Sequence, residues 1–176
     1  AAVLACAGEA IRQLAKLGVQ LPAAAFTGCT MTLESEDEGG LPERSLFIPS
    51  RHLAIVRMDQ RLRVTGKLFL GPRTEAEKRA EYNRIYDAAL GALVNCRPRA
   101  SSIRFWSATV EALPDGFPAA GLTKAAAGLA VSAAHGLHGL QTSLGAAAII
   151  ASALSEEDDP GAQDFAQACS PDRFSR

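Results

Sequence analysis

The pattern of hydrophobic and polar residues predicts alternating strands and helices near both ends of the chain. Residues 2–7 (AVLACA) form a short apolar run that is followed by Gly8. The next segment, EAIRQLAKLG, places Ile11, Leu14 and Leu17 at helical spacing. A buried strand, a glycine and an amphipathic helix that ends at a glycine are typical of α/β proteins.

The middle of the chain changes to the alternation of apolar and polar residues that is typical of half-buried antiparallel strands. The clearest case is residues 61–69 (RLRVTGKLF), which Asp59-Gln60 precede as a hairpin turn would. Further strands are predicted at residues 26–33, 46–48, 53–57, 103–110 and 117–122. The middle therefore resembles a meander, unlike the ends.

A long helix is predicted within this strand-rich region. Thr74 and Glu77 match a capping box, in which each residue satisfies a backbone N–H of the first turn. Residues 75–93 then carry one apolar face among charged positions. That face is made of Ala80, Ile85, Ala89 and Leu93.

The stretch GLAVSAAHGLHGLQTSLGAAAIIASAL combines a buried strand, a glycine turn and an alanine-rich helix. Residues 129–134 are small and apolar, as in a strand buried on both faces. Residues 135–139 hold two glycines, and Thr142 or Ser143 is expected to cap a helix over residues 144–154. Such a junction gathers unpaired N–H groups and a positive helix-dipole end, which suits an anion or an electron-rich ring oxygen. Ordinary α/β packing around a tight turn explains the pattern equally well.

Composition narrows the function classes. The chain has 176 residues and a net charge of −1, which gives no reason to expect nucleic acid as a partner. Four scattered cysteines predict neither a disulfide framework nor a metal site, and they fit reduced thiols in the cytoplasm. His135 and His138 lack an evident third ligand, so we predict no metal there.

One region invites a membrane interpretation. Between residues 117 and 154, Lys124 is the only acidic or basic residue besides two histidines. The longest unbroken apolar piece, residues 144–152, is shorter than the roughly 20 residues that a membrane span needs. We therefore expect no transmembrane span and a cytoplasmic protein, with peripheral association at the inner face of the membrane as an alternative.

Six motifs, taken in order, resemble the C-terminal part of the FAD-dependent D-amino acid oxidase superfamily, in particular its D-amino acid dehydrogenase-like branch. They are VLACAG (3–8), FTGCTMTL (26–33), RLRVTG (61–66), LPDGFPAAG (113–121) after Trp106, GLAVSAAHGLHGLQTS (128–143) and SPDRF (170–174). Together they extend over nearly the whole chain.

The resemblance implies a mixed α/β fold, in which the C-terminal portion of a Rossmann-like FAD-binding domain is combined with an antiparallel-sheet substrate domain. Residues 1–24 would belong to the FAD-binding domain and residues 25–112, with a helix at 74–95, to the substrate domain. Residues 113–160 would return to the FAD-binding domain, and residues 161–176 would form a C-terminal tail.

The resemblance also implies a cofactor and a site. The backbone of the turn would lie against FAD through His135, Gly136, Leu137, His138, Gly139 and Leu140. Gly8 is a further candidate for flavin contact. Trp106 and Arg104 are candidates for substrate binding, although Trp106 on its own is expected to belong to the core. No catalytic residue is assigned, because hydride transfer to a flavin requires no obligatory acid–base group.

Three departures from the family pattern matter. The G-x-G-x-x-G fingerprint for the FAD pyrophosphate is absent, which predicts a truncated chain or one subunit of a split enzyme whose N-terminal half lies elsewhere. Val110 stands where the family has an arginine that holds the substrate carboxylate. Either another base such as Arg104 or Arg57 replaces it, or the substrate is not an ordinary amino acid, or the fragment is inactive. Cys29 replaces a family tyrosine and is expected to be a small buried residue.

Two functional interpretations from different classes follow. In the first, the chain is part of a flavin-dependent enzyme that oxidises the CH–NH bond of an amino acid by hydride transfer. In the second, it is a non-catalytic remnant or partner subunit of a split flavoenzyme, which Val110 and the absent fingerprint favour. A flavoprotein that acts on a hydroxy acid or an opine is a variant of the first.

Overall fold

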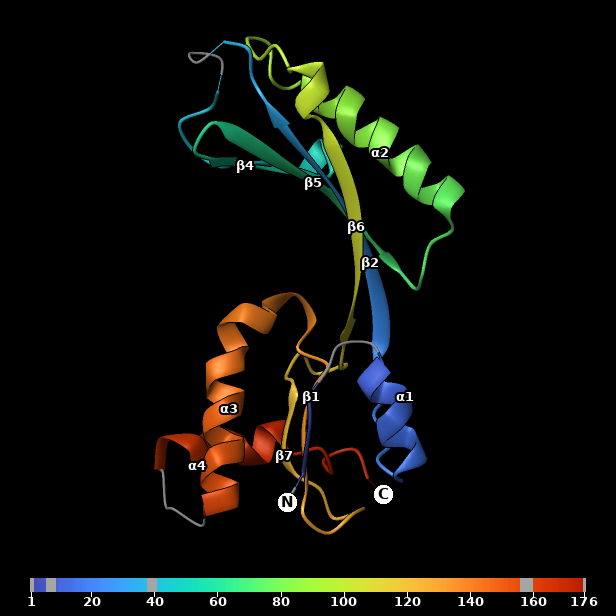
Figure 1. Cartoon of the computed structure of the whole chain (residues 1–176), viewed down its shortest axis with the longest axis vertical. Helices are drawn as coiled ribbons and strands as arrows, with labels where there is room; N and C mark the ends of the chain where they lie inside the picture. Colours follow the sequence, from blue (N-terminus) through green and yellow to red (C-terminus); the bar gives the residue numbers. More distant parts are fainter. Residues whose placement is uncertain (1, 6–8, 38–40, 156–159, 176) are drawn as a thin grey trace. The chain divides into compact units, whose positions relative to one another are not determined.

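The computed structural model describes residues 2–5, 9–37, 41–155 and 160–175. It contains two compact units, which are described separately (Figure 1). The first consists of Ala1–Phe26 with Val110–Arg176, and the second is Thr27–Thr109. The predicted fold class is confirmed, since strands and helices alternate in the first unit and an antiparallel sheet dominates the second.

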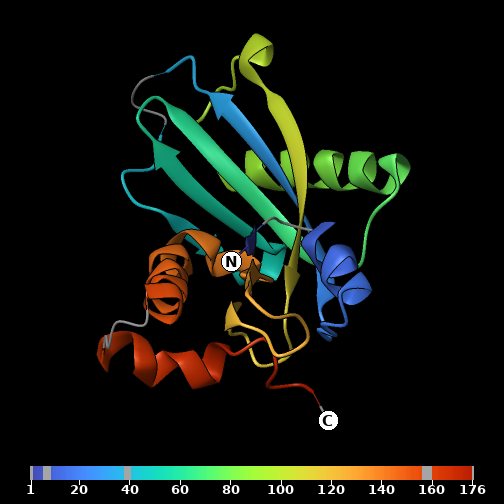
Figure 2. The same ribbon diagram turned by 60° about the horizontal axis from the view of Figure 1, so that its bottom comes forward.

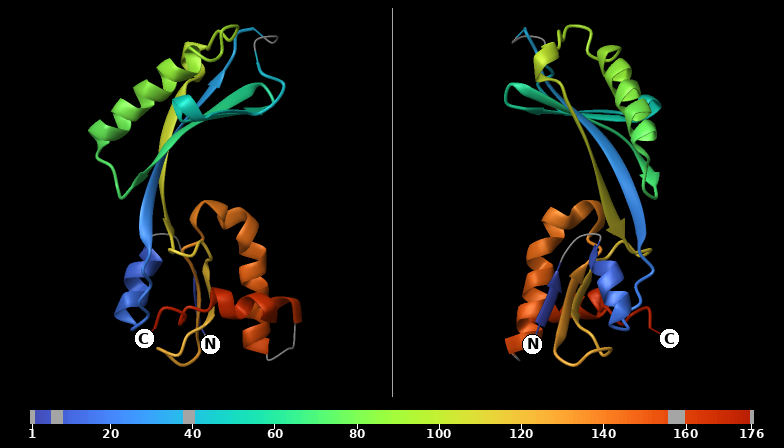
Figure 3. Two further views of the ribbon diagram at one scale, coloured as in Figure 1. Left: turned by 180° about the vertical axis from the view of Figure 1, so that it is seen from behind. Right: turned by 45° about the vertical axis from the view of Figure 1, so that its right-hand side comes forward.

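The first unit is built on a three-stranded sheet with the order β1-β8-β7. Strand β1 (Ala2–Ala5) runs parallel to β8 (Leu129–Ala133), and β7 (Ala119–Leu122) pairs with β8 in antiparallel fashion. Helix α1 (Glu9–Lys16) lies on one side of this sheet and α3 (Gly139–Ser155) on the other (Figures 1 and 3). Strand β8 is thus covered on both faces, which explains its continuous run of small apolar residues.

Two apolar clusters form the core of this unit. On the α1 side, Ala10 and Leu14 pack with Val131 of β8. On the α3 side, Ala120 of β7 packs with residues of α3 and of α4 (Pro160–Cys169). The C-terminal segment is fastened to the unit, because Arg173 donates to both carboxylate oxygens of Asp115 at 2.7 and 3.1 Å.

The second unit is a five-stranded sheet with the order β3-β4-β5-β2-β6. Its strands are β3 (Leu46–Ile48), β4 (Leu53–Met58), β5 (Arg61–Leu70), β2 (Ala24–Glu34) and β6 (Arg104–Ala112), of which β2 and β6 extend into the first unit. Helix α2 (Glu75–Leu90) covers one face of this sheet, as Figure 2 shows. Short 3-10 turns lie at Pro49–Arg51 and Ala100–Ser102.

The alternation predicted for the middle of the chain determines which face of the sheet α2 covers. Leu62 and Val64 of β5 are buried against Ile85 of α2, whereas Arg61 and Arg63 are exposed. The capping box is confirmed, because the Thr74 hydroxyl accepts from the Glu77 N–H and the Glu77 carboxylate accepts from the Thr74 N–H. Each pair satisfies a donor that the helix itself cannot.

Several element boundaries differ from the expectations. Helix α2 ends at Leu90, short of residue 93, because the chain turns at Gly91. Helix α3 begins at Gly139, five residues before the expected start, so neither Thr142 nor Ser143 is its N-cap. Helix α4 lies in the segment that was expected to be a tail. Residues 6 and 7 of the first predicted strand lie outside the described residues.

The length on which the membrane argument rested needs a correction. The 3-10 turn Gly136–His138 continues directly into α3, and the helical segment Gly136–Ser155 is long and apolar enough to cross a membrane by length and composition. The apolar piece counted in the sequence began at residue 144, whereas the helical segment also includes the glycines and histidines of the turn before it. This test alone is weak evidence for a span, since a core helix of a soluble protein also passes it.

Candidate functional site

The turn between β8 and α3 has a backbone that restricts its sequence. Ala134 and Gly136 both have positive φ, at 55° and 59°. A Cβ on Gly136 would lie 3.2 Å from the Cβ of Ala112, so even a methyl group would be tight. The two residues flank His135, which forms an isolated antiparallel bridge with Ala112. The glycine is therefore required both by conformation and by space.

His135 holds the turn through both ring nitrogens. Thr142 Oγ1 donates to the His138 carbonyl at 3.0 Å, so it can accept a hydrogen bond from His135 Nδ1 at 2.8 Å. The other nitrogen, Nε2, lies 3.0 Å from the Ser132 hydroxyl and in the neutral ring accepts from it. Burial lowers the pKa of His135 below its ordinary value, which agrees with this neutral form.

A pH dependence follows from this histidine. Because the folded pKa is lowered, the unfolded chain binds the proton more readily, and stability falls as pH decreases below about 6.5 towards the folded pKa. We expect the free energy of unfolding to fall less between pH 7.5 and pH 5 in His135→Gln than in the native chain. Urea titrations at the two pH values measure this, and His138→Gln at an exposed position is the control. Equal slopes in all three proteins would contradict the assignment.

The beginning of the helix after the turn leaves its N–H groups available. His135 precedes the helical segment without a side-chain cap, and the hydroxyls of Thr142 and Ser143 donate to carbonyls, those of His138 and Leu140. Leu137 and Leu140 are exposed beside this end, Leu140 to 88%. Donors next to bare apolar surface suit a flat, partly apolar group that carries an electron-rich oxygen, so the residues present fit a flavin ring.

The structure thus brings His135, Gly136, Leu137, His138, Gly139 and Leu140 together at one end of α3. Gly8 lies outside the described residues. Within those residues, no group of three histidine, cysteine or acidic side chains could hold a metal ion. Cys29 is buried, and burial raises the pKa of its thiol, so a nucleophilic thiolate is disfavoured there.

Trp106 and Arg104 lie on β6 of the second unit. The expectation that Trp106 belongs to the core is wrong, since its side chain is 44% exposed. The tryptophan points away from the face that α2 covers, because its neighbour Phe105 stacks on Tyr82 of α2 with ring centroids 5.0 Å apart. One nitrogen of Arg104, Nη1, donates to the carbonyls of Ser101 and Ile103 at 2.8 and 2.9 Å.

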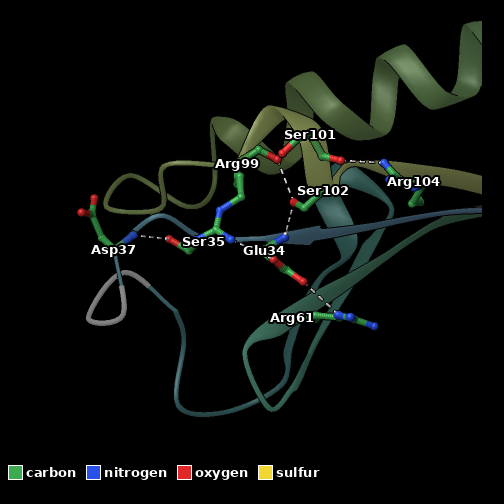
Figure 4. A network of polar contacts seen from close by, with 8 residues as sticks. All are labelled: Glu34, Ser35, Asp37, Arg61, Arg99, Ser101, Ser102 and Arg104. Carbon is green, nitrogen blue, oxygen red and sulfur yellow. Dashed lines mark hydrogen bonds and ion pairs between the residues drawn. The ribbon is translucent and has the colours of Figure 1, made fainter.

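A polar network lies at the end of this sheet where β6 begins (Figure 4). Glu34 at the end of β2 pairs with Arg61 at 3.2 Å and with Arg99 at 3.4 Å, and its backbone N–H donates to the Ser102 hydroxyl. The carboxylate therefore offsets the positive charge gathered there. This network ties the loop before β6 to β2.

Sequence reasoning named Arg104 and Arg57 as candidates for binding the substrate, but it missed another arginine on this sheet. Arg63 of β5 has its guanidinium carbon 5.8 Å from the centre of the Trp106 ring. The alternation in RLRVTG could have placed Arg63 on the exposed face, opposite Leu62 and Val64. Its proximity to Trp106 could not have been predicted, because it depends on the strand order β5-β2-β6.

Comparison with known proteins identifies the class. The model of the DAO family, described as FAD dependent oxidoreductase, matches residues 1–153. The chain therefore belongs to the DAO family of FAD-dependent oxidoreductases. The predicted resemblance is thereby confirmed at the level of the family.

Curated relatives include two proteins named D-amino acid dehydrogenase. The one from Bradyrhizobium diazoefficiens is 32% identical over 160 residues, which cover 87% of this chain and 36% of the relative. The one from Rhizobium rhizogenes is 28% identical over 142 residues, which cover 81% of this chain and 33% of the relative. The chain spans about a third of the length of these relatives.

Solved structures share the fold. Glycine oxidase from Geobacillus kaustophilus matches with a TM-score of 0.77 and 21% identity over 99% of this chain and 45% of that chain. L-proline dehydrogenase from P. horikoshii matches with a TM-score of 0.71 and 17% identity over 99% of this chain and 46% of that chain. At these identities the likeness shows the fold alone.

Proposed function

We propose that the chain is the C-terminal part of an FAD-dependent enzyme that oxidises the CH–NH bond of an amino acid, of the D-amino acid dehydrogenase type. The observation that carries the proposal is the uncapped helix end that directly follows a glycine turn and a buried strand. Membership of the DAO family and the relatives named D-amino acid dehydrogenase support it.

The residues of the turn would have separate tasks. Gly136 lets a ring approach the backbone, and the N–H groups at the start of α3 stabilise negative charge on a ring oxygen. Leu137 and Leu140 exclude water, and His135 holds the turn in place through Ser132 and Thr142. When bound, FAD supplies the hydride acceptor for the substrate's α-carbon.

A partner portion would complete the first unit. Leu137, Leu140 and Leu144 repeat at helical spacing along the helical segment Gly136–Ser155, and Leu140 and Leu144 are 88% and 82% exposed. Strand β1 lies at the edge of its sheet, where a further strand can pair with it. We infer that the part of the full-length family proteins that this chain does not span covers this leucine row and this strand edge. That part would lie in the same polypeptide or in a separate subunit. We place the assembly in the cytoplasm, at the inner face of the membrane if it is membrane-associated.

Activity of the completed protein tests the proposal. The chain is produced together with the polypeptide of its source organism that carries the rest of the FAD-binding and substrate domains. The complex is then assayed with a dye as the electron acceptor. We expect oxidation of D-alanine, with L-alanine and D-lactate turned over at least tenfold more slowly. Turnover of D-lactate or an opine instead would support the hydroxy-acid or opine variant. A flavin-containing complex without any turnover would support the non-catalytic subunit, which the valine at position 110 favours.

A further inference from the structure

One face of the five-stranded sheet carries no helix among the described residues of its unit, because α2 packs on the other (Figures 2 and 3). Strand alternation gives this open face a polar composition over three of its five strands, β5, β2 and β6. The side chains concerned are Arg61, Arg63, Thr65, Thr30, Thr32, Glu34, Arg104 and Trp106.

On this face Arg63 and Trp106 lie on the two strands that flank β2. Arg63 is directly opposite Thr32 of the neighbouring strand β2, and β6 with Trp106 follows on the far side of β2. The guanidinium therefore reaches over β2 to the indole, at 5.8 Å from the ring centre. Contact with an aromatic face orients the planar guanidinium and leaves its N–H edge available for an acceptor with two oxygens.

The other arginines on the strands of this sheet are engaged. Arg61 pairs with Glu34, and Arg57 Nε donates to the Asp59 carbonyl at 2.9 Å. Arg104 uses Nη1 on two carbonyls of the preceding turn. In the described part of the chain, by contrast, no acidic side chain forms an ion pair with Arg63. Its charge is available to a ligand.

Threonines share this face with Arg63. Thr32 is opposite Arg63, and two residue pairs further along the strands Thr30 Oγ1 and Thr65 Oγ1 lie 3.4 Å apart. These groups can bind a second polar function of a small ligand, and the exposed indole can contact its apolar part. The face thus combines a cation, hydroxyls and an aromatic surface within three strands.

We propose that Arg63, Thr32 and Trp106 form a binding subsite for the carboxylate of a small organic acid. That this acid is the amino-acid substrate rests on the function proposed above. Arg63 forms the bidentate pair with the carboxylate, and Trp106 fixes the arginine and contacts the carbon skeleton. The Thr32 hydroxyl donates a hydrogen bond to one of the carboxylate lone pairs that the arginine leaves free.

The single tryptophan of the chain reports on this subsite directly, because Trp106 is the only source of indole fluorescence. The probes are D-alanine, propionate, which lacks the amine, and D-alaninamide, which lacks the carboxylate. We expect saturable changes in emission with D-alanine and propionate, and at least tenfold weaker binding of D-alaninamide. Arg63→Met should weaken propionate binding at least tenfold, and Arg79→Met, at an exposed position of α2 on the other side of the sheet, should leave it within twofold.

Arg63→Lys keeps the positive charge but lacks the two parallel N–H donors of the guanidinium. It provides a second variant if Arg63→Met fails to fold. It should bind propionate roughly fivefold more weakly than the native chain. An unchanged titration in either variant, equal binding of D-alaninamide, or the absence of any response in the native chain would overturn the subsite.

These measurements need no flavin, so the two proposals fail separately. Carboxylate binding by a chain whose completed complex is colourless would overturn the proposed function and support the subsite. An active flavin-containing complex in which Arg63→Met leaves the KM for D-alanine unchanged would overturn the subsite alone.

Discussion

Arg84→Met is expected to lower the free energy of unfolding by roughly 3 kcal/mol, because it leaves a buried carboxylate without its counter-charge. Glu81 on α2 is 4% exposed. Arg84 donates to its two oxygens, from Nε at 2.8 Å and from Nη2 at 2.7 Å. The Arg84 side chain itself is 31% exposed, so water moderates the loss and the lower end of the range for broken buried pairs applies.

The double variant Glu81→Met with Arg84→Met separates the cost of an unpaired charge from the loss of the pair. Replacing both partners with apolar groups should restore stability to within about 1 kcal/mol of the native chain. Urea unfolding followed by circular dichroism measures all three proteins. Arg79→Met, at an exposed position of the same helix, is the matched control. If Arg84→Met is as stable as Arg79→Met, the ion pair does not stabilise the second unit.

Gly66→Ala is expected to destabilise the second unit by about 2 kcal/mol through overpacking. A Cβ at Gly66 would lie 2.5 Å from Glu81 Oε1 and 2.7 Å from Ile85 Cδ1. Helix α2 thus lies against β5 too closely for a side chain at this position. Adding Ile85→Val to Gly66→Ala removes one of the clashing methyl groups and should recover part of the loss.

A different glycine provides the control for this effect. Gly145 lies inside α3, and a Cβ added there would meet no atom within 4 Å. Gly145→Ala should therefore stabilise the chain by up to about 1 kcal/mol through helix propensity. Thermal unfolding compares the variants. A neutral Gly66→Ala would show that α2 can move away from the sheet at little cost.

The sequence predicted those features that depend on local chemistry. The capping box at Thr74 and Glu77 forms as expected, since both partners lie within one turn. The turn at Leu113–Gly116 has a similarly local origin, with Gly116 at positive φ and Asp115 accepting from the Phe117 N–H. The alternation in β5 correctly separated buried from exposed residues because it follows from strand geometry.

The features that could not be predicted depend on contacts between distant segments. Arg173 and Asp115 belong to two separate sequence motifs, and only the fold shows that they pair. Trp106 is exposed because its face of the sheet has no covering helix among the described residues, which no local pattern indicates. Helix α3 begins earlier than the sequence predicted. Gly139 is its first residue and Gly136 belongs to the 3-10 turn before it, although both glycines favoured a loop in the sequence.

The flavin content of the completed protein tests the central claim most directly. The account predicts that the native complex purifies yellow with stoichiometric flavin, whereas Gly136→Val, which cannot adopt the turn backbone, retains little of it. Gly145→Ala on the same helix should keep the full amount. A colourless native complex, or undiminished flavin in a folded Gly136→Val complex, would contradict the claim that this glycine turn and helix end hold the cofactor.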